Sequence, residues 1–307
     1  ADSLAAQAAG ADVPEAGYQG AYVADWATEM PSGADPVEWG RERAVADQRA
    51  VLESLSIGFD AWFSERSMVE SGAVEDTLAD LKSAGATYED DGALWLRSSD
   101  HGDDKDRVLV KSDGEYTYLL PDVAYHRDKF ARAPRLVNVW GADHHGYVAR
   151  VHAAMAALGH QPADLEVAIT QMVGLRRAGE EVRLSKRTGE MIELREVVAE
   201  VGADAARFTY LLQSVDSSQV FDLDLVASQI NENPVFYVQY AHARIHSIVS
   251  RAAEVGIERV PLAAADISLL VHHRELALLR TLHELPDIVR WACRERAPHQ
   301  VTTWVRE

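Results

Sequence analysis

The chain has 307 residues, 47 % of them hydrophobic, and this length and composition exclude a disordered polymer and allow two domains. No apolar run is long enough to cross a bilayer and Cys293 is the only cysteine, so we expect a cytoplasmic protein with neither membrane spans nor disulfides. The net charge of -19 is concentrated in residues 1–115, where 25 acidic side chains outnumber 9 basic ones, and this acidity argues against a nucleic-acid surface there because phosphates would be repelled.

Residues 1–120 are expected to form helices followed by a strand hairpin. Asp35 can cap a helix whose first residue is Pro36, because an acidic N-cap followed by proline is a common helix start. Gly85 can end a second helix, since glycine readily adopts the left-handed conformation needed there. The expected elements are a helix over residues 35–55, a helix over 74–85, a strand over 93–96 and a hairpin over 108–118.

From residue 122 onward, helical and strand patterns alternate. Helices are expected over residues 123–131 and 148–159, the second with its apolar residues on one face. Strands are expected over residues 136–140 and 165–173, where apolar residues predominate. This β-α-β rhythm predicts a parallel sheet.

After residue 225 the pattern becomes wholly helical. Asn233 precedes a proline and begins a long helix with an apolar stripe. That stripe consists of Val235, Val238, Ile245 and Val249. We therefore predict an α/β domain over residues 1–225, with a helical and strand insertion at about 25–115, and an all-helical domain over residues 226–307.

A basic loop at residues 183–189 has the composition of a polyphosphate site. Lys186 supplies a mobile charge for phosphate oxygens, and Gly189 allows a tight backbone path. Ser185 and Arg187 add a hydroxyl group and a second cation. The alternative is an ordinary solvated loop, which the motif taken alone favours.

The run from Gly141 to Gly146 follows a predicted strand, at the end of a parallel sheet where α/β proteins bind ligands. It contains Asp143, His144 and His145, all of which are possible metal ligands. Adjacent side chains point apart, however, and no further histidine lies at helical spacing. Polar recognition of a small substrate is therefore favoured over a metal site.

Tyr118 and Asp122 are spaced so that a phenol and a carboxylate can face one cationic ligand. We expect Tyr118 to be buried, and a carboxylate is the geometric partner of a guanidinium group because the two form parallel hydrogen bonds in one plane. The alternative is that Asp122, which follows a proline, only caps a helix.

The helix that begins near Asn233 carries aromatic residues and an arginine on one face. Tyr237, Tyr240 and Arg244 share this face, and such side chains can stack on single-stranded bases. Ordinary packing is the alternative and is the commoner use of an aromatic stripe.

Together and in this order, these segments resemble a bacterial arginyl-tRNA synthetase, and the resemblance covers nearly the whole chain. The matching segments are Gly17-Tyr18-Gln19-Gly20-x-Tyr22, Phe59-Asp60-x-Trp62-Phe63-Ser64-Glu65, Tyr118-x-x-x-Asp122, Gly141–Gly146, Gln171-Met172-Val173, Ser185–Gly189 and Asn233–Arg244.

The resemblance implies a role for each matching residue. Those implied for arginine binding are Tyr118, Asp122, Asp143, His144 and His145, with Asp122 paired to the guanidinium group. Those implied for ATP binding are Gln171, Met172, Val173, Lys186 and Gly189. The catalytic residues would be Ser185, Lys186 and Arg187, which match the second class I signature and would stabilise the departing pyrophosphate. Those implied for tRNA contacts are Asn233, Tyr237, Tyr240 and Arg244.

The resemblance also implies a fold and a reaction. The fold is a parallel, Rossmann-like nucleotide-binding half-domain of a class I synthetase with insertions, followed by an all-α anticodon-binding bundle. The reaction is ATP-dependent activation of L-arginine to arginyl-adenylate and its transfer to tRNA(Arg), with Mg²⁺ arriving with the ATP and no dedicated metal site. We expect a monomer that does not bind membranes.

One feature of the family is absent from the chain, namely the first class I signature, a His-x-Gly-His run. Family members carry this run upstream of the matching segments, so we expect the chain to be an internal fragment that is inactive alone. Two further hypotheses are a non-catalytic paralogue that binds tRNA or arginine, and a metal-dependent hydrolase using Asp143, His144 and His145. An intact Ser185-Lys186-Arg187 run argues against the first, and the second lacks a fourth ligand.

Overall fold

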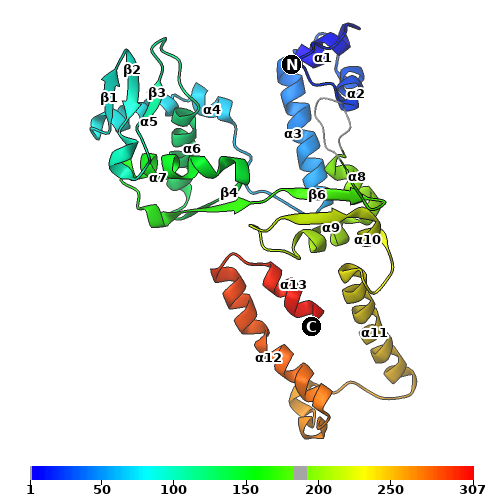
Figure 1. The fold of residues 1–307 in the computed structure, drawn as a ribbon. Helices are drawn as coiled ribbons and strands as arrows, with labels where there is room; N and C mark the ends of the chain where they lie inside the picture. The colour runs from blue at the N-terminus through cyan, green and yellow to red at the C-terminus, as the bar shows by residue number, and fades with distance from the viewer. Residues whose placement is uncertain (1, 183–191) are drawn as a thin grey trace. The chain divides into compact units, whose positions relative to one another are not determined.

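The computed structural model describes residues 2–182 and 192–307 (Figure 1). The predicted phosphate-binding residues Ser185, Lys186, Arg187 and Gly189 therefore lie outside the described residues. The chain forms two compact units, one of residues 59–172 and 215–218, the other of residues 1–58, 173–214 and 219–307. Segments of the two units thus alternate along the chain, whereas the sequence pattern predicts one boundary, at residue 226, between an α/β domain and an all-helical domain.

The 59–172 unit combines an antiparallel sheet with a parallel strand pair. Its elements are α4 (Glu65–Glu70), α5 (Ala73–Ser83), β1 (Thr87–Asp90), β2 (Ala93–Leu96), η1 (Ser98–His101), β3 (Arg107–Val110), α6 (Leu119–Arg132), β4 (Leu136–Gly141), η2 (Ala142–Tyr147), α7 (Val148–Ala157), η3 (Pro162–Asp164) and β5 (Leu165–Thr170). Strands β1, β2 and β3 pair in that order, and β4 pairs with β5 in parallel. The predicted parallel pairing of these two segments is confirmed.

The core of this unit lies among α5, α6, α7 and the strands. Leu81, Leu120 and Val151 are fully buried, one from each of these helices. Gly85 follows α5 with a φ of 71°, a left-handed conformation in which glycine is not strained, so the predicted helix end is confirmed.

Helix α6 begins four residues earlier than its apolar pattern predicts. Pro121 is its third residue, a position that proline tolerates because first-turn N–H groups have no partner within the helix. Tyr118 therefore occupies the N-cap position, and Asp122 lies in the first turn. The alternative in which Asp122 caps the helix is wrong. The expected burial of Tyr118 is wrong too, since this residue is 91 % exposed at the helix boundary.

The second parallel strand is shorter than predicted. Strand β5 ends at Thr170, and Val173 begins β6 (Val173–Arg177) in a separate sheet of the other unit. The mostly apolar pattern over residues 165–173 hides this break, because two strands joined by a two-residue link can have the same hydrophobic pattern as one longer strand.

The other unit contains a small mixed sheet surrounded by helices. Its elements are α1 (Asp2–Ala8), α2 (Ala21–Glu29), α3 (Pro36–Ser54), β6, β7 (Glu180–Glu181), α8 (Leu194–Val201), α9 (Ala203–Tyr210), β8 (Gln219–Asp222), α10 (Leu223–Ala227), α11 (Pro234–Glu254), η4 (Leu262–Ala264), η5 (Ile267–Leu269), α12 (His273–Arg294) and α13 (His299–Arg306). Asp35 caps α3 as predicted, its side chain accepting a hydrogen bond from the backbone nitrogen of Val37 at 2.9 Å. In the described parts of the chain, no helix is long and apolar enough to cross a membrane.

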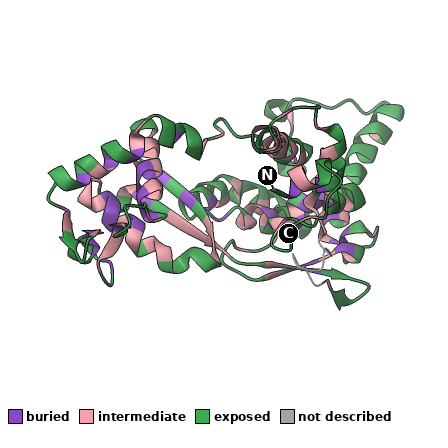
Figure 2. Cartoon of the chain, turned by 90° about the horizontal axis from the view of Figure 1, so that it is seen from above, coloured by how far each residue is buried: buried purple, intermediate pink, exposed green. Residues whose placement is uncertain are grey.

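Helix α11 is buried only near its beginning. Val235 is 5 % exposed and belongs to the core around Phe221, whereas Ile245 and Val249 of the same predicted stripe are 61 % and 48 % exposed. Every residue from Gln239 to Arg251 is exposed. Figure 2 colours exposed residues green, intermediate ones pink and buried ones purple. Helix α11 contacts α9 and α13 of its own unit, whereas Ile245 and Val249 of the stripe are exposed.

Asn233 fastens the start of α11 to the preceding segment. Its side-chain oxygen accepts a hydrogen bond from the backbone nitrogen of Val235 at 3.0 Å. Its side-chain nitrogen donates to the carbonyl oxygens of Val226 at 2.9 Å and Ser228 at 2.7 Å. Because Asn233 is 2 % exposed, both the oxygen and the nitrogen of its side-chain amide form their hydrogen bonds within the protein.

Replacing Asn233 with alanine is expected to lower the free energy of unfolding by about 2–3 kcal/mol, because a cap is lost and two carbonyl oxygens lose their donor. Asn233→Asp separates these effects. Aspartate caps well but cannot donate, so we expect it to destabilise at least as much as alanine. Denaturant unfolding measures both variants, and a near-neutral aspartate variant would show that only the cap matters.

Candidate functional site

The carboxyl end of the β4–β5 pair collects polar side chains from two elements. Strand β4 runs directly into η2, which carries Asp143, His144, His145 and Tyr147. The first turn of α6 brings Asp122 to the same place, since Asp122 is near enough to His144 and Tyr147 for both to affect its pKa. Ligands of α/β proteins bind at this edge, so the location agrees with a binding site.

The carboxylate of Asp122 is half-buried and sits among groups of both signs. Burial raises its pKa and so does Glu65, whereas Tyr147, Lys129 and His144 lower it. Burial dominates because a charged carboxylate loses hydration there. A bound cation would offset that loss, and a guanidinium group could do so with two parallel hydrogen bonds.

Tyr147 is a member of this site that sequence reasoning missed. Its hydroxyl is buried and makes no hydrogen bond of good geometry, yet it lies close enough to Asp122 for each group to shift the pKa of the other. Burial and then the carboxylate raise the pKa of Tyr147, so it stays a neutral phenol that can donate to Asp122. Its place directly after the Gly141–Gly146 run was the signal that could have identified it.

A buried polar chain connects α6 with β4 next to Asp122. The imidazole of His126 contacts the backbone oxygen of Asp122 through Nδ1 at 2.7 Å and the side-chain nitrogen of Asn138 through Nε2 at 2.7 Å. The side-chain oxygen of Asn138 accepts from the ammonium group of Lys129 at 2.9 Å. These residues were also missed, although His126 lies one turn after Asp122 and Asn138 interrupts an apolar strand.

The protein is expected to lose stability in mild acid because of His126. Burial lowers the pKa of this imidazole to about 4, below the value of about 6.5 expected when unfolded. The unfolded chain therefore binds a proton that the folded chain excludes between these two values. The contribution of the neutral imidazole to the free energy of unfolding is fully present above pH 6.5. It is lost as the pH falls toward 4, and the total loss is about 3 kcal/mol.

Unfolding by denaturant at pH 7 and pH 4.5 measures this loss. We expect His126→Gln to show a smaller decrease between the two pH values than the unsubstituted protein. His101→Gln, at an exposed histidine of η1, is the control and should leave the decrease unchanged. Equal decreases in all three proteins would contradict a buried neutral imidazole.

The remaining residues predicted for substrate lie on the surface of the 59–172 unit. His144 is 3.6 Å from Asp143 and both side chains are largely exposed. His145 and Gln171 are also exposed, and Tyr118 and Met172 are 91 % and 79 % exposed. The structure thus brings Asp122 and His144 together and leaves Tyr118 and Met172 facing solvent. Within residues 2–182 and 192–307, no group of three potential metal ligands occurs.

The residues predicted to contact RNA divide between surface and interior. Tyr237 and Tyr240 are each 48 % exposed on α11, and the guanidinium of Arg244 lies 5.7 Å from the centre of the Tyr240 ring. These side chains are available to a partner. Asn233 is not, because its amide holds the start of the helix.

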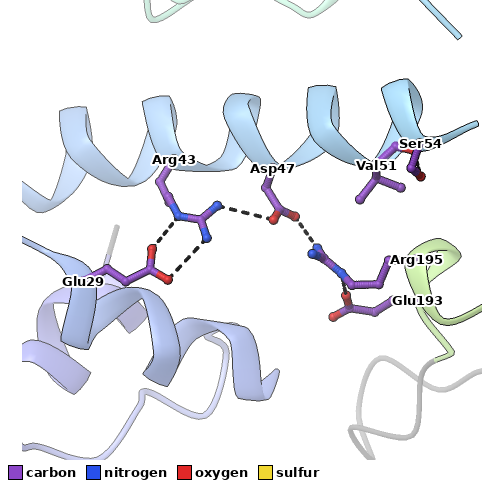
Figure 3. Close-up of polar contacts among 7 residues, drawn as sticks. All are labelled: Glu29, Arg43, Asp47, Val51, Ser54, Glu193 and Arg195. Carbon is purple, nitrogen blue, oxygen red and sulfur yellow. Dashed lines mark hydrogen bonds and ion pairs between the residues drawn. The ribbon is translucent and has the colours of Figure 1, made fainter. Parts of the chain in front are cut away.

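The segment after residues 183–191 is anchored by a chain of alternating charges (Figure 3). Glu29 of α2 pairs with Arg43 of α3 at 2.7 Å, and Arg43 contacts Asp47 at 3.3 Å. Asp47 pairs with Arg195 of α8, which also pairs with Glu193. Single exposed ion pairs contribute little, but this network ties α8 to α3 and α2 at several points.

Comparison with protein families gives two matches along the chain. The model of the class I tRNA synthetase (R) catalytic domain matches residues 40–249. The model of the DALR anticodon-binding domain matches residues 238–307.

Individual proteins agree with these matches. The chain is 44 % identical over 311 residues to arginine–tRNA ligase 1 of Halalkalibacterium halodurans, and 46 % identical over 320 residues to the arginine–tRNA ligase of Geobacillus kaustophilus. These alignments cover 96 % and 97 % of the chain but 56 % of each relative. The chain therefore spans little more than half the length of these relatives.

Solved structures show the same similarity. A candidate arginyl-tRNA synthetase from Campylobacter jejuni superposes with a TM-score of 0.85 at 31 % identity, covering 99 % of this chain and 70 % of that one. The arginyl-tRNA synthetase of Thermus thermophilus superposes with a TM-score of 0.69 at 22 % identity, covering 88 % of this chain and 55 % of that one. The second comparison shows a shared fold.

Proposed function

The chain belongs to the class I arginyl-tRNA synthetase family, and from this premise we propose that the protein containing it activates L-arginine with ATP and transfers the arginyl group to tRNA(Arg). The observation that supports this most is the half-buried carboxylate of Asp122 at the carboxyl edge of the parallel strands. A cationic amino acid fits there better than a neutral one, because it supplies the charge that offsets the buried carboxylate.

In the proposed reaction, the residues of the chain mainly bind and orient the substrates. Asp122 pairs with the guanidinium group, while the nearby neutral phenol of Tyr147 can donate to the same carboxylate and help orient it. His144 and Asp143 border the substrate from η2. Because the arginine carboxylate itself attacks the α-phosphate of ATP, positioning and charge neutralisation are the contributions required from the protein.

We assign the other substrates to separate segments. Gln171 with the backbone of Met172 and Val173 would border adenine, and Lys186 with its neighbours Ser185, Arg187 and Gly189 would neutralise the phosphates. Mg²⁺ would arrive as part of the ATP substrate. The exposed face of α11 with Tyr237, Tyr240 and Arg244 would contact tRNA, where aromatic rings and an arginine can stack on unpaired bases.

Amino-acid-dependent ATP–pyrophosphate exchange by the full-length protein, measured with tRNA present, tests this function. We expect exchange with arginine, and at least about 30-fold less with citrulline, which has nearly the same shape but no charge to pair with Asp122. Equal exchange with both amino acids would contradict the guanidinium site. Arginine binding without any exchange would indicate a non-catalytic relative instead.

A further inference from the structure

A buried bridge joins α6 to β4 at the helical turn that carries Asp122. His126 lies one turn further along α6 and Asn138 lies in the middle of β4, and the two residues are 3 % and 4 % exposed. The bridge runs from the Asp122 carbonyl oxygen through the imidazole to the Asn138 amide, with both contacts at 2.7 Å. It therefore links the backbone of Asp122 to a different element of the fold.

Only one arrangement of hydrogen atoms satisfies this bridge. A carbonyl oxygen cannot donate, so Nδ1 of His126 carries a proton and donates it to Asp122. The neutral imidazole then has a lone pair on Nε2, which accepts from the side-chain NH₂ group of Asn138. The Asn138 oxygen is thereby turned toward Lys129, whose ammonium group donates to it at 2.9 Å. Each polar group has a partner of the required kind, so the bridge is a specific connection.

The pattern of β4 shows that Asn138 is not there for packing. Inward positions of a half-buried strand are ordinarily apolar, yet here the inward Asn138 is polar while the flanking Val137 and Val139 are 45 % and 67 % exposed. Burying an amide is costly unless its hydrogen bonds are made. Asn138 therefore contributes to this position mainly through the hydrogen bonds that connect it to His126 and Lys129.

We propose that His126 and Asn138 are positioning residues for the carboxylate of Asp122, an inference that rests on the function proposed above. Strand β4 leads into η2, which carries His144 and Tyr147, whereas Asp122 comes from α6. The separation of the two groups depends on how α6 is seated on β4. A guanidinium group needs both carboxylate oxygens in one plane, and a displacement of about 0.5 Å is enough to weaken such a site.

The test compares Asn138→Leu with the unsubstituted full-length protein in arginine-dependent ATP–pyrophosphate exchange with tRNA present. Leucine has nearly the same size but cannot donate to His126. We expect the KM for arginine to rise about 10-fold, the effect of losing roughly one good hydrogen bond, with the KM for ATP changed less than about twofold. Should this variant not fold, Asn138→Ser takes its place, because a serine hydroxyl is too short to reach Nε2.

The same substitution in an Asp122→Asn background shows whether the effect passes through Asp122. We expect less than about a twofold further rise in the arginine KM there, because the carboxylate to be positioned is already gone. Leu136→Ala, at a buried residue of β4 outside the bridge, is the control for general destabilisation and should leave the arginine KM unchanged.

Two results would overturn the inference: the same rise in arginine KM in both backgrounds, or a parallel rise in the KM for ATP. Either would mean that Asn138 only stabilises the unit. A failure of the proposed function is distinguishable, since it would appear in the unsubstituted protein as exchange that does not depend on arginine.

Discussion

Replacing Asp122 with asparagine in the full-length protein is expected to raise the arginine concentration needed for half-maximal ATP–pyrophosphate exchange by about 30-fold to 4,000-fold. Asparagine has the same size, so the packing of α6 is kept, but it removes the charge that would face the guanidinium group. Losing one member of a desolvated charge pair typically costs about 2–5 kcal/mol, which corresponds to this range.

The structure removes the main competing explanation for such an effect. Asp122 does not cap α6, so the substitution cannot act by weakening a helix cap. The Tyr147 hydroxyl makes no hydrogen bond of good geometry to Asp122, so the substitution does not break one. The remaining differences between the two proteins are the negative charge and one acceptor oxygen, and a guanidinium group would use both.

Asp128→Asn is the matched control for this experiment. Asp128 lies on the same helix and pairs with Arg132 at 2.9 Å, so the control makes the same chemical change away from the site. We expect its arginine dependence to stay within about twofold of the unsubstituted protein, since exposed pairs contribute at most about 1 kcal/mol. If Asp122→Asn also left the arginine dependence unchanged, the guanidinium contact would have to lie elsewhere, first at Asp143.

Replacing Arg107 with methionine is expected to lower the free energy of unfolding by about 3–5 kcal/mol, because it leaves a buried carboxylate without its partner. The Asp103 side chain is 1 % exposed. Its two oxygens accept from Nε and Nη2 of Arg107 at 2.8 and 2.9 Å, and the backbone nitrogen of Asp104 donates to it at 2.8 Å. Arg107 also lies near Tyr147, so its loss would reach the edge of the Asp122 site.

This effect should depend on pH in a definite direction. The Arg107 guanidinium holds the pKa of Asp103 well below its usual range, although burial opposes this. The carboxylate therefore stabilises the folded protein above the unfolded pKa of about 3.9, and this contribution is lost as the pH falls below that value. In Arg107→Met the largest cause of the lowered pKa is gone, while the hydrogen bonds from Asp104 remain and burial still opposes them, so the difference between the two proteins should shrink as the pH falls below about 4.

The double variant Asp103→Leu/Arg107→Met separates two effects on the free energy of unfolding: the contribution of the ion pair itself, and the destabilisation caused by a buried charge without a partner. We expect it to recover most of the lost stability, because an apolar pair has no charge to desolvate. Denaturant unfolding at pH 7 measures all three proteins. A single variant that costs less than about 1 kcal/mol, or a double variant no more stable than the single one, would contradict a buried pair of this strength.

Much of the local structure could be predicted from the sequence because its causes lie within a few residues. Asp35 before Pro36, and Gly85 after an apolar helix, are signals whose physics involves only the nearest turn. The alternation from residue 122 correctly predicted the parallel pairing of β4 with β5, since a crossover that contains a helix is the usual connection between parallel strands. The helical spacing after residue 226 needed no knowledge of distant contacts either.

Failures occurred where a residue's role depends on segments distant in the sequence. Helix α6 begins at Leu119 rather than near Val123, and this leaves Tyr118 exposed at the boundary. The run at residues 165–173 divides between two units, because Val173 pairs with Gln219 in another sheet. Periodicity cannot reveal either outcome, since both depend on which surfaces meet after folding.

For the candidate site, the sequence by itself predicted which segments would carry the chemistry. The structure brings two of them together, the turn with Asp122 and the run that includes His144, whereas the basic loop at Lys186 lies outside the described residues. Only the tertiary structure decided which other residues lie around Asp122. Tyr147, His126 and Asn138 have no distinctive spacing, and their importance arises from burial and from hydrogen bonds between α6, β4 and η2. A sequence motif shows only which side chains it contains. Burial and hydrogen bonding are properties of the packed fold, because a side chain loses its hydration and gains its partners only when segments distant in the sequence come together.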